Sequence, residues 1–264
     1  MSETPAGDGR RIEHHMGTTI TLHAVGAPRE AVDRFFAEIR TLETCLSRFR
    51  HDSEVMRIER GELTVDEASP RVREVLIRCD SLRSATRGAF DHRPVIDGRR
   101  RLDPNAFAKG WIIEQALIHL RMAGVCSYFV NAGGDVVVGD APHGQSAWRV
   151  GITHPDDPAA VFARLDLVRS AIATSGRYER GDHIRCADGT AAALGGDVLT
   201  SVSVIGPELA TADALATAVF AGGEQRPRWW RRDSPCGIVS VDASGRVRLT
   251  ENVADAVSVG ADMR

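Results

Sequence analysis

Apolar positions along the chain predict helices in the first half, with one strand before them. Apolar residues recur every three or four positions in three segments: 28–47, 72–86 and 109–123. Alternation of apolar and polar residues predicts a strand at 18–25. The segment 49–63 is polar and irregular, and 87–105 reads as an exposed loop because it is rich in Gly, Pro, Asp and Arg.

The second half contains short runs typical of strands, each bounded by turn residues. These runs are 127–132, 135–139, 148–153, 161–168, 171–175 and 198–205. A helix follows over 211–220, and GIVSVD and RVRLT, separated by Ala-Ser-Gly, predict a closing hairpin. Since regular β-helix-β alternation is absent from the middle third, we expect an α/β or α+β fold with mixed or antiparallel sheets flanked by helices. We expect a flexible start over 1–12 and a single domain over 13–264.

Amino-acid composition limits which binding partners and which cellular compartment we expect for the protein. The 264 residues include 33 basic and 36 acidic ones, for a formal net charge of -3, which argues against nucleic acid as a partner. Five scattered cysteines without a CxxC pair suggest free thiols in a reducing compartment. No apolar run reaches the length of a signal peptide core or a membrane span, so we expect a cytoplasmic protein without a transmembrane segment. The Arg-rich segment 226–232, with two Trp, is read as a solvated loop with snorkelling arginines, and its role is left open.

Asp213 and Thr217 are the first candidates for chemistry. They lie four residues apart in the helix expected over 211–220, so their side chains share one face. Hard oxygen ligands of this kind suit Mg²⁺, which takes only one or two protein carboxylates. The alternative is structural, because Asp is favoured near a helix start and Thr can bond back to the preceding turn.

Three further stretches permit a chemical or a structural interpretation. NAGGD at 131–135 is either a close approach of bare backbone to a ligand or a tight turn. His183, which ends SGRYERGDH, is either a general base or an inert surface residue. GAFD at 88–91 and LDPNAFAKGW at 102–111 combine carboxylates with Lys109 at a helix start, a combination that suits binding of a phosphate. The structural alternative is that Asp103 or Asn105 caps the helix and that Lys109 is solvated.

The order of these stretches resembles the ApbE family, the FAD:protein FMN transferases. The resemblance runs from about residue 12 to 250, and seven motifs in the family's order are far more specific than any one of them. The motifs are MGTTI at 16–20, SRFRHDSEV at 47–55, GAFD at 88–91, LDPNAFAKGW at 102–111, NAGGD at 131–135, ATSGRYERGDHI at 173–184 and TADALATAVF at 211–220.

The resemblance implies an enzyme that binds FAD with Mg²⁺, cleaves the pyrophosphate and moves FMN to a Thr of an acceptor flavoprotein, with release of AMP. It places the metal on the carbonyl of Ala106 and the side chains of Asp213 and Thr217. It implies a set of FAD contacts at Met16, Phe49, Ala89, Phe90, Asp91, Asp103 and Lys109. His183 matches the proposed base for the acceptor Thr.

Two departures from the family pattern bear on the reaction. After His183 the chain reads HIRCADGT, so Cys186 and Ala187 stand where the family's HIxDPxTG stretch has Asp and Pro. Glu59, in SEVMRIERGE, stands where the family often has Asn. Two alternatives to a transferase therefore stay open: an FAD pyrophosphatase in which water replaces the acceptor Thr, and a non-catalytic FAD-binding protein.

Overall fold

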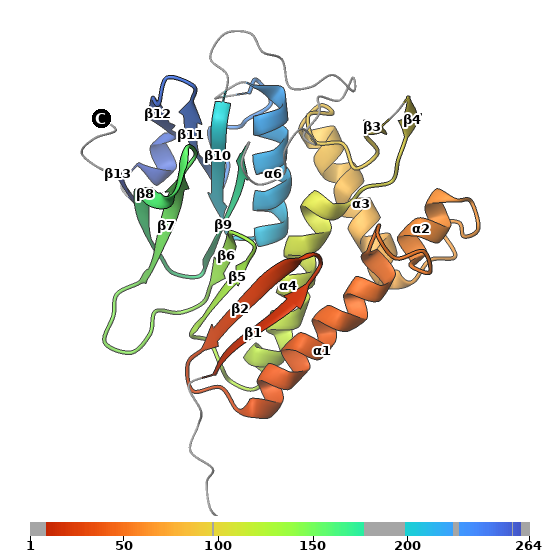
Figure 1. Ribbon diagram of the computed structural model, residues 1–264, viewed down its shortest axis with the longest axis horizontal. Coiled ribbons are helices and arrows are strands. Elements are labelled where there is room, and N and C mark those ends of the chain that lie inside the picture. Colours follow the sequence, from red (N-terminus) through yellow and green to blue (C-terminus); the bar gives the residue numbers. More distant parts are fainter. Residues whose placement is uncertain (1–8, 97, 177–198, 224–226, 255, 260–264) are drawn as a thin grey trace, which may run out of the picture.

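The computed structural model describes residues 9–96, 98–176, 199–223, 227–254 and 256–259, and its centre is an eight-stranded sheet (Figure 1). In spatial order the strands are β1 (Arg10–His15), β2 (Thr18–Ala24), β5 (Tyr128–Ala132), β6 (Asp135–Val138), β9 (Ser170–Gly176), β10 (Leu199–Gly206), β11 (Gly237–Asp242) and β12 (Val247–Leu249). Each neighbouring pair in this order is antiparallel. The expectation of an α+β fold with antiparallel sheets is therefore confirmed.

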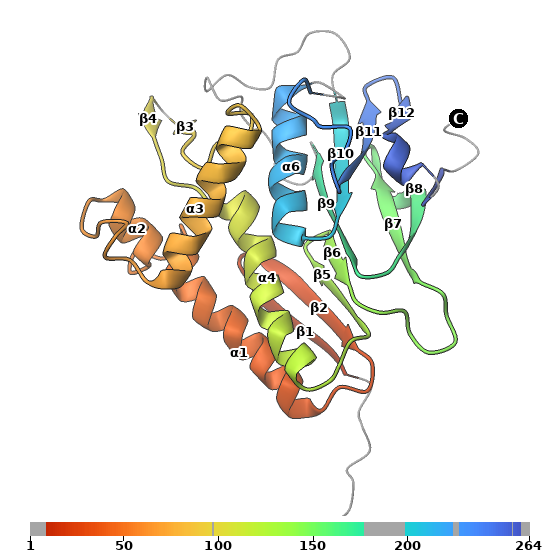
Figure 2. The same cartoon turned by 180° about the vertical axis from the view of Figure 1, so that it is seen from behind.

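Helices cover one face of this sheet, as Figures 1 and 2 show from opposite sides. The helices are α1 (Arg29–Leu46), α2 (Glu54–Glu59), α3 (Pro70–Ala85), α4 (Asn105–Met122) and α6 (Leu209–Gly222). Apolar side chains of these helices and of the facing strand positions form the larger core, which includes Phe35, Trp111 and Val137. Among the described helices, none has both the length and the apolar character that crossing a bilayer requires.

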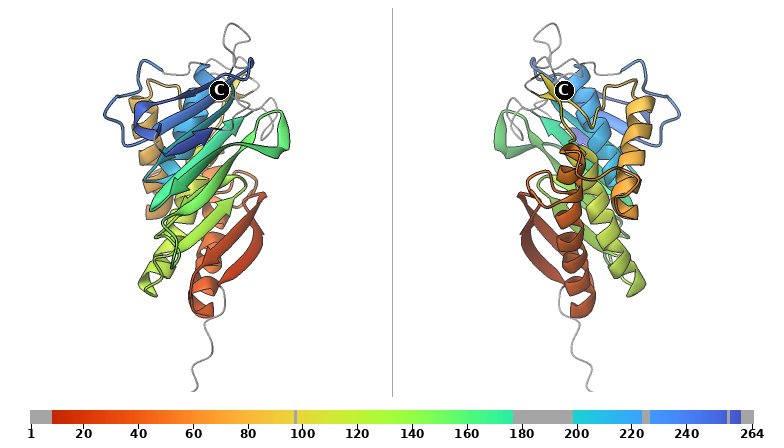
Figure 3. Two further views of the ribbon diagram at one scale, coloured as in Figure 1. Left: turned by 90° about the vertical axis from the view of Figure 1, so that its left-hand side faces the viewer. Right: turned by 90° about the vertical axis from the view of Figure 1, so that its right-hand side faces the viewer.

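A second, smaller sheet packs on the opposite face of the large one, so the central layer is buried on both sides (Figure 3). It consists of β13 (Val257–Val259), β8 (Asp157–Leu167) and β7 (Trp148–His154). Side chains alternate across a strand, so Val137 faces the helices while Val136 and Val138 face the small sheet. Burial on both faces explains why β6 reads as a continuous apolar run.

The helices expected at 28–47, 72–86, 109–123 and 211–220 are confirmed, as are the strands of the second half. The polar interpretation of 49–63 was wrong at its centre, where α2 forms. The Ser53 hydroxyl accepts a hydrogen bond from the Met56 N–H (3.1 Å) and thereby starts this short helix.

The expected flexible start and exposed loop also need correction. Strand β1 begins at Arg10, inside the 1–12 segment, because its backbone pairs with β2 although its sequence is polar. The segment 87–105 contains a small hairpin of β3 (Val95–Ile96) and β4 (Arg99–Arg100). Phe90 and Leu102, which flank the hairpin, are buried in the larger core.

The environment of His92, which also lies beside this hairpin, predicts that the stability of the protein depends on pH. Its side chain is 1% exposed, and neither ring nitrogen has a hydrogen-bond partner among the described residues. Burial lowers the pKa of His92, although the Asp80 carboxylate, 3.6 Å from Nε2, opposes this shift.

Because the folded protein disfavours protonated His92, the free energy of unfolding should be unaffected by this residue above about pH 6.5 and should decrease as the pH drops below that value. The loss reaches at most about 1.4 kcal/mol per pH unit, since one proton is involved. Urea unfolding at pH 7.5 and 5.5 should show a larger drop in the free energy of unfolding for the wild type than for His92→Phe. Equal drops would show that His92 is not the source.

Candidate functional site

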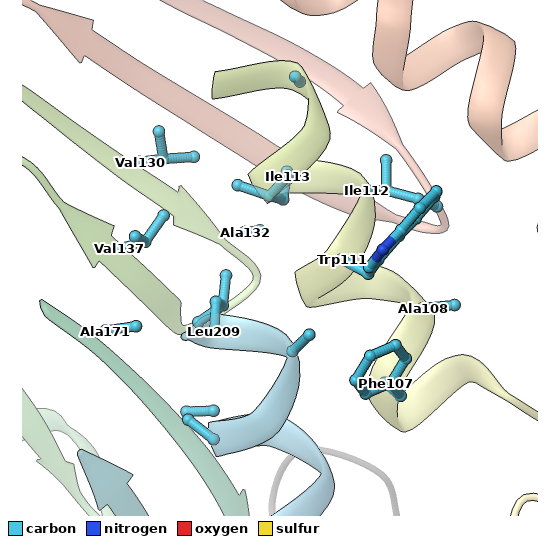
Figure 4. Close-up of a cluster of buried hydrophobic side chains, with 14 of the residues drawn as sticks. Phe107, Ala108, Trp111, Ile112, Ile113, Val130, Ala132, Val137, Ala171 and Leu209 are labelled. Carbon is cyan, nitrogen blue, oxygen red and sulfur yellow. The ribbon is translucent and has the colours of Figure 1, made fainter. Parts of the chain in front are cut away.

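Helices α4 and α6 touch backbone to backbone, although about a hundred residues of chain separate them. Gly110 makes this possible, because a Cβ atom there would lie only 2.5 Å from the Ala210 nitrogen. Figure 4 shows the start of α6, at Leu209, in the same cluster of buried side chains as Ile113 of α4. The contact brings the second turn of α6 close to Lys109.

Lys109 lies between two buried carboxylates. Its Nζ forms an ion pair with Asp135, at the start of β6, and lies 3.4 Å from Oδ2 of Asp213 in the second turn of α6. The side chains of Asp135 and Asp213 are 1% and 2% exposed, and that of Lys109 is 16% exposed. Two carboxylates and one ammonium leave an excess negative charge among these three groups, which favours binding of a cation.

The NAGGD turn between β5 and β6 aims Asp135 at this cluster. Gly133 and Gly134 have positive φ angles of 65° and 98°, and a Cβ on Gly133 would lie 2.2 Å from the Thr18 hydroxyl oxygen. Asp135 is held in turn by the Thr174 N–H, which donates to Oδ1 (3.0 Å). The tight-turn interpretation of NAGGD is therefore confirmed. Asp135 itself, which we did not single out, was signalled only by its place after two glycines.

Hydroxyl groups lie on both faces of β9. The Ser175 and Thr217 hydroxyl oxygens are 3.4 Å apart, so α6 turns Thr217 toward the sheet. The Thr174 hydroxyl, on the opposite face of β9, is hydrogen-bonded to that of Ser203 (2.8 Å). Carboxylate oxygens of β6 and α6 thus lie beside Lys109, and the Thr217 hydroxyl lies one helical turn beyond Asp213.

The donor types favour a hard cation. Among the described residues, no group of three or more His, Cys, Asp and Glu side chains is arranged to hold a metal. Mg²⁺ does not require such a group, because one or two carboxylates suffice when water and phosphate oxygens complete its octahedron. The buried Asp213 and the hydroxyl of Thr217 fit that requirement. Ala106 lies in the first turn of α4, one turn before Lys109.

Comparison with known proteins gives the family. The model of the ApbE family matches residues 16–94 and 95–239. This chain belongs to the ApbE family. An FAD:protein FMN transferase of Rhodobacter capsulatus is 37% identical over 161 residues, which cover 58% of this chain and 28% of that protein. Another, from Treponema pallidum, is 30% identical over 209 residues, covering 71% of this chain and 58% of the relative. The chain therefore spans less than two thirds of the length of these curated relatives.

Solved structures of the ApbE family share the fold. The flavin transferase ApbE of Vibrio cholerae superimposes with a TM-score of 0.79 at 19% identity, over 94% of this chain and 98% of that one. The flavinyl transferase ApbE of Pseudomonas stutzeri, in its apo form, gives a TM-score of 0.75 at 20% identity, over 98% and 100% of the two chains. The family and the fold expected from the motif order are confirmed.

Among the ApbE positions at the start of α4, Asp103 and Lys109 have clear structural partners. The Asp103 carboxylate accepts a hydrogen bond from the Asn105 N–H (3.2 Å) and pairs with Arg48. The N-cap residue of α4 is Pro104, which makes no side-chain cap, so the cap interpretation was wrong in position, although Asp103, one residue earlier, does bind the first N–H of the helix. The role of Asp103 toward FAD stays a prediction. The solvated interpretation of Lys109 was wrong, because the side chain points inward to two carboxylates.

The GAFD turn is firmly held. The side chain of Asp91 is 6% exposed, and its carboxylate accepts from the Arg93 N–H (2.9 Å) and pairs with Arg83 and Arg100 (both 3.2 Å). Phe90 is buried in the larger core and Ala89 packs against it. These contacts fix the conformation of the turn, whose part in FAD binding stays a prediction.

Met16 and Phe49 lie on two other elements. Met16, in the β1–β2 turn, has a φ of 52°, and its N–H donates to the Glu43 carboxylate (2.8 Å). Phe49, just after α1, is 84% exposed. The neighbouring Arg48–Asp103 ion pair ties the Phe49 segment to the start of α4.

Two positions bear on the departures from the ApbE pattern. Glu59 accepts a hydrogen bond from the Leu102 N–H (2.7 Å) and lies 3.3 Å from an Arg101 nitrogen, so it links α2 to the segment before α4. His183, with Cys186 and Ala187, lies outside the described residues.

The described part of the Arg- and Trp-rich segment is a solvated loop, as expected. Trp229 and Trp230 are half-buried against the larger core, with ring centroids 5.8 Å apart. The arginines Arg228, Arg231 and Arg232 are exposed, and Arg231 pairs with Asp233. The tryptophans thus anchor a loop whose arginines are solvated.

Proposed function

We propose that this ApbE family member is a Mg²⁺-dependent FAD:protein FMN transferase. It would cleave the pyrophosphate of FAD, transfer FMN to a Thr of an acceptor flavoprotein and release AMP. The observation that supports this most directly is the cluster in which Lys109 lies between the buried carboxylates of Asp135 and Asp213. The names of the curated relatives support the same reaction.

The residues of the cluster have distinct proposed roles. Asp213, Thr217 and the carbonyl of Ala106 hold Mg²⁺, which when bound neutralises charge on the pyrophosphate. Lys109 offers its ammonium to the phosphate oxygens, where negative charge increases as AMP leaves. Asp135 keeps that ammonium in place.

The transfer itself requires positioning more than a special nucleophile. The acceptor Thr oxygen attacks the phosphorus on the FMN side, the bond from that phosphorus to the bridging oxygen breaks, and AMP leaves with this oxygen. His183 takes the hydroxyl proton. When the site holds the acceptor oxygen in line with the bond that breaks, this alignment accounts for much of the lowering of the activation barrier. Contacts to FAD are proposed at Met16, Phe49, Ala89, Phe90, Asp91 and Asp103, and the exposed Phe49 ring is free to cover an aromatic ligand.

Replacing His183 by Ala should slow transfer to the acceptor by roughly a hundredfold, because general-base catalysis contributes at least that much. The rate of flavinylated acceptor formation measures this, and His143→Ala, which removes an exposed histidine elsewhere, serves as the control. An unchanged rate in His183→Ala would show that another group takes the proton.

Hydrolysis of FAD is a second candidate, and the departure after His183 motivates it. With Cys186 and Ala187 where the family has Asp and Pro, water could replace the acceptor Thr. Incubation with FAD and Mg²⁺ alone separates the two reactions, because rapid release of FMN and AMP without acceptor favours hydrolysis. Tight flavin binding without turnover, even with acceptor, would instead indicate a binding protein.

Mass spectrometry of a candidate acceptor tests the proposed transfer. After incubation with FAD, Mg²⁺ and this protein, the acceptor should gain the mass of one FMN less one water, and the gain should disappear with EDTA or when the acceptor Thr is replaced by Ala. An acceptor of unchanged mass, while AMP accumulates, would contradict a transferase.

A further inference from the structure

The first peptide groups of α6 are capped by a side chain from another helix. A helix start leaves N–H groups without an intrahelical acceptor. The α6 N-cap residue, Glu208, makes no side-chain cap, and the first turn carries no acidic residue. Instead, Oε1 of Glu114, on α4, accepts hydrogen bonds from the Leu209 and Ala210 N–H groups, the second at 3.3 Å.

Glu208 is engaged elsewhere. Its carboxylate pairs with Arg78 of α3 and accepts a hydrogen bond from the Thr211 hydroxyl (2.8 Å). Burial raises the pKa of Glu114, and the hydrogen bonds from the Ala210 and Leu209 N–H groups oppose that rise. The Glu114 carboxyl is therefore in a poorly solvated position where these backbone N–H groups are its polar partners.

Three contacts from one short segment of α4 hold the first two turns of α6, which also packs on β9 and β10. Lys109 pairs with Asp213, Gly110 admits the backbone of Ala210, and Glu114 binds the first N–H groups. The same stretch of α4 therefore holds both the start of α6 and its first functional carboxylate.

We propose that Glu114 is a positioning residue of the FAD site, which sets where Asp213 and Thr217 lie relative to Lys109. This proposal rests on the proposed function, since it assigns Asp213 and Thr217 to Mg²⁺. A displacement of about 1 Å can reduce a rate a hundredfold, and loss of groups that orient metal ligands typically costs 10- to 100-fold in metal affinity.

Metal affinity provides a test that does not require turnover. Mn²⁺ accepts the same oxygen ligands as Mg²⁺, and its binding can be followed by electron paramagnetic resonance. Glu114→Ala should weaken Mn²⁺ binding by about tenfold or more. Glu114→Gln, whose amide oxygen can still accept from the N–H groups, should stay within about threefold of the wild type.

A matched variant separates positioning from general stability. Trp111, also on α4, donates its indole N–H to Glu74 of α3 (3.0 Å), so Glu74→Ala removes a hydrogen bond that joins the same helix to α3 rather than to α6. Thermal melting should show destabilisation in Glu74→Ala and in Glu114→Ala, whereas Mn²⁺ affinity should fall only in Glu114→Ala. If Glu114→Ala does not fold, Glu114→Asp, whose carboxylate is one methylene shorter, should show the same loss.

The outcomes distinguish this proposal from the proposed function. Wild-type Mn²⁺ affinity in a folded Glu114→Ala or Glu114→Asp variant, or an equal loss in Glu74→Ala, would overturn the role of Glu114 alone. A wild-type protein that binds no Mn²⁺ and releases no AMP from FAD with Mg²⁺ would overturn the proposed function, and the role of Glu114 with it.

Discussion

Replacement of Lys109 by Met should destabilise the protein by about 3 kcal/mol and slow FAD cleavage by at least about a hundredfold. The loss of stability arises because Asp135 and Asp213 would remain buried without the ammonium between them. We expect the lower end of the range for buried ion pairs, since the Lys109 side chain is 16% exposed and water can partly replace it. Urea unfolding measures the first effect, and AMP release from FAD measures the second.

A double variant separates the two effects of Lys109. The double variant Lys109→Met/Asp135→Asn also removes one of the two buried carboxylates that have lost their ammonium partner. It should therefore recover much of the lost stability. The double variant should not recover FAD cleavage, because the Lys109 ammonium that faces the pyrophosphate is still missing. Full activity in a folded Lys109→Met variant would rule out the proposed role of this side chain.

Asp213→Asn should have the larger effect on the reaction and little effect on stability. Asn has nearly the same shape, and Lys109 keeps its ion pair with Asp135. Loss of a carboxylate ligand to Mg²⁺ removes several kcal/mol of charge stabilisation, which corresponds to about a thousandfold in rate. AMP release, titrated against Mg²⁺, should also show a much higher half-saturating concentration.

Asp135→Asn is the matched control for Asp213→Asn. It also removes one of the two carboxylates beside Lys109, but not one of the proposed metal ligands. We expect about a tenfold loss of rate, through poorer placement of Lys109, with the half-saturating Mg²⁺ concentration unchanged. Equal changes in Mg²⁺ dependence in the two variants would contradict the assignment of the metal to Asp213 rather than Asp135.

The recurrence of apolar residues was enough to place α1, α3, α4 and α6. Helix α1 buries a regular apolar stripe, whereas α4 and α6 are buried on most of their surface and were recognised by the length of their apolar segments. The same method missed β1 and α2. Strand β1 is polar and owes its structure to backbone pairing with β2, and α2 is a single short helix started by Ser53. Both depend on partners that an apolar pattern does not record.

Part of the candidate site could also be predicted. Spacing alone put Asp213 and Thr217 on one helical face, and the motif order identified the ApbE family. Asp135 and Glu114 were missed, because neither belongs to a periodic pattern that signals a ligand. Their contacts to Lys109 and to the start of α6 join residues between 26 and 96 positions apart in the sequence.

By itself, then, the sequence determined the main helices and strands, the family and the shared face of Asp213 and Thr217. These depend on interactions between residues a few positions apart, or on motifs that can be read in order. Only the tertiary structure decided that Lys109 lies between two buried carboxylates and that α4 caps α6. Those features follow from packing at Gly110, where the absence of a side chain lets two distant helices meet, and local sequence does not specify which backbone will fill that space.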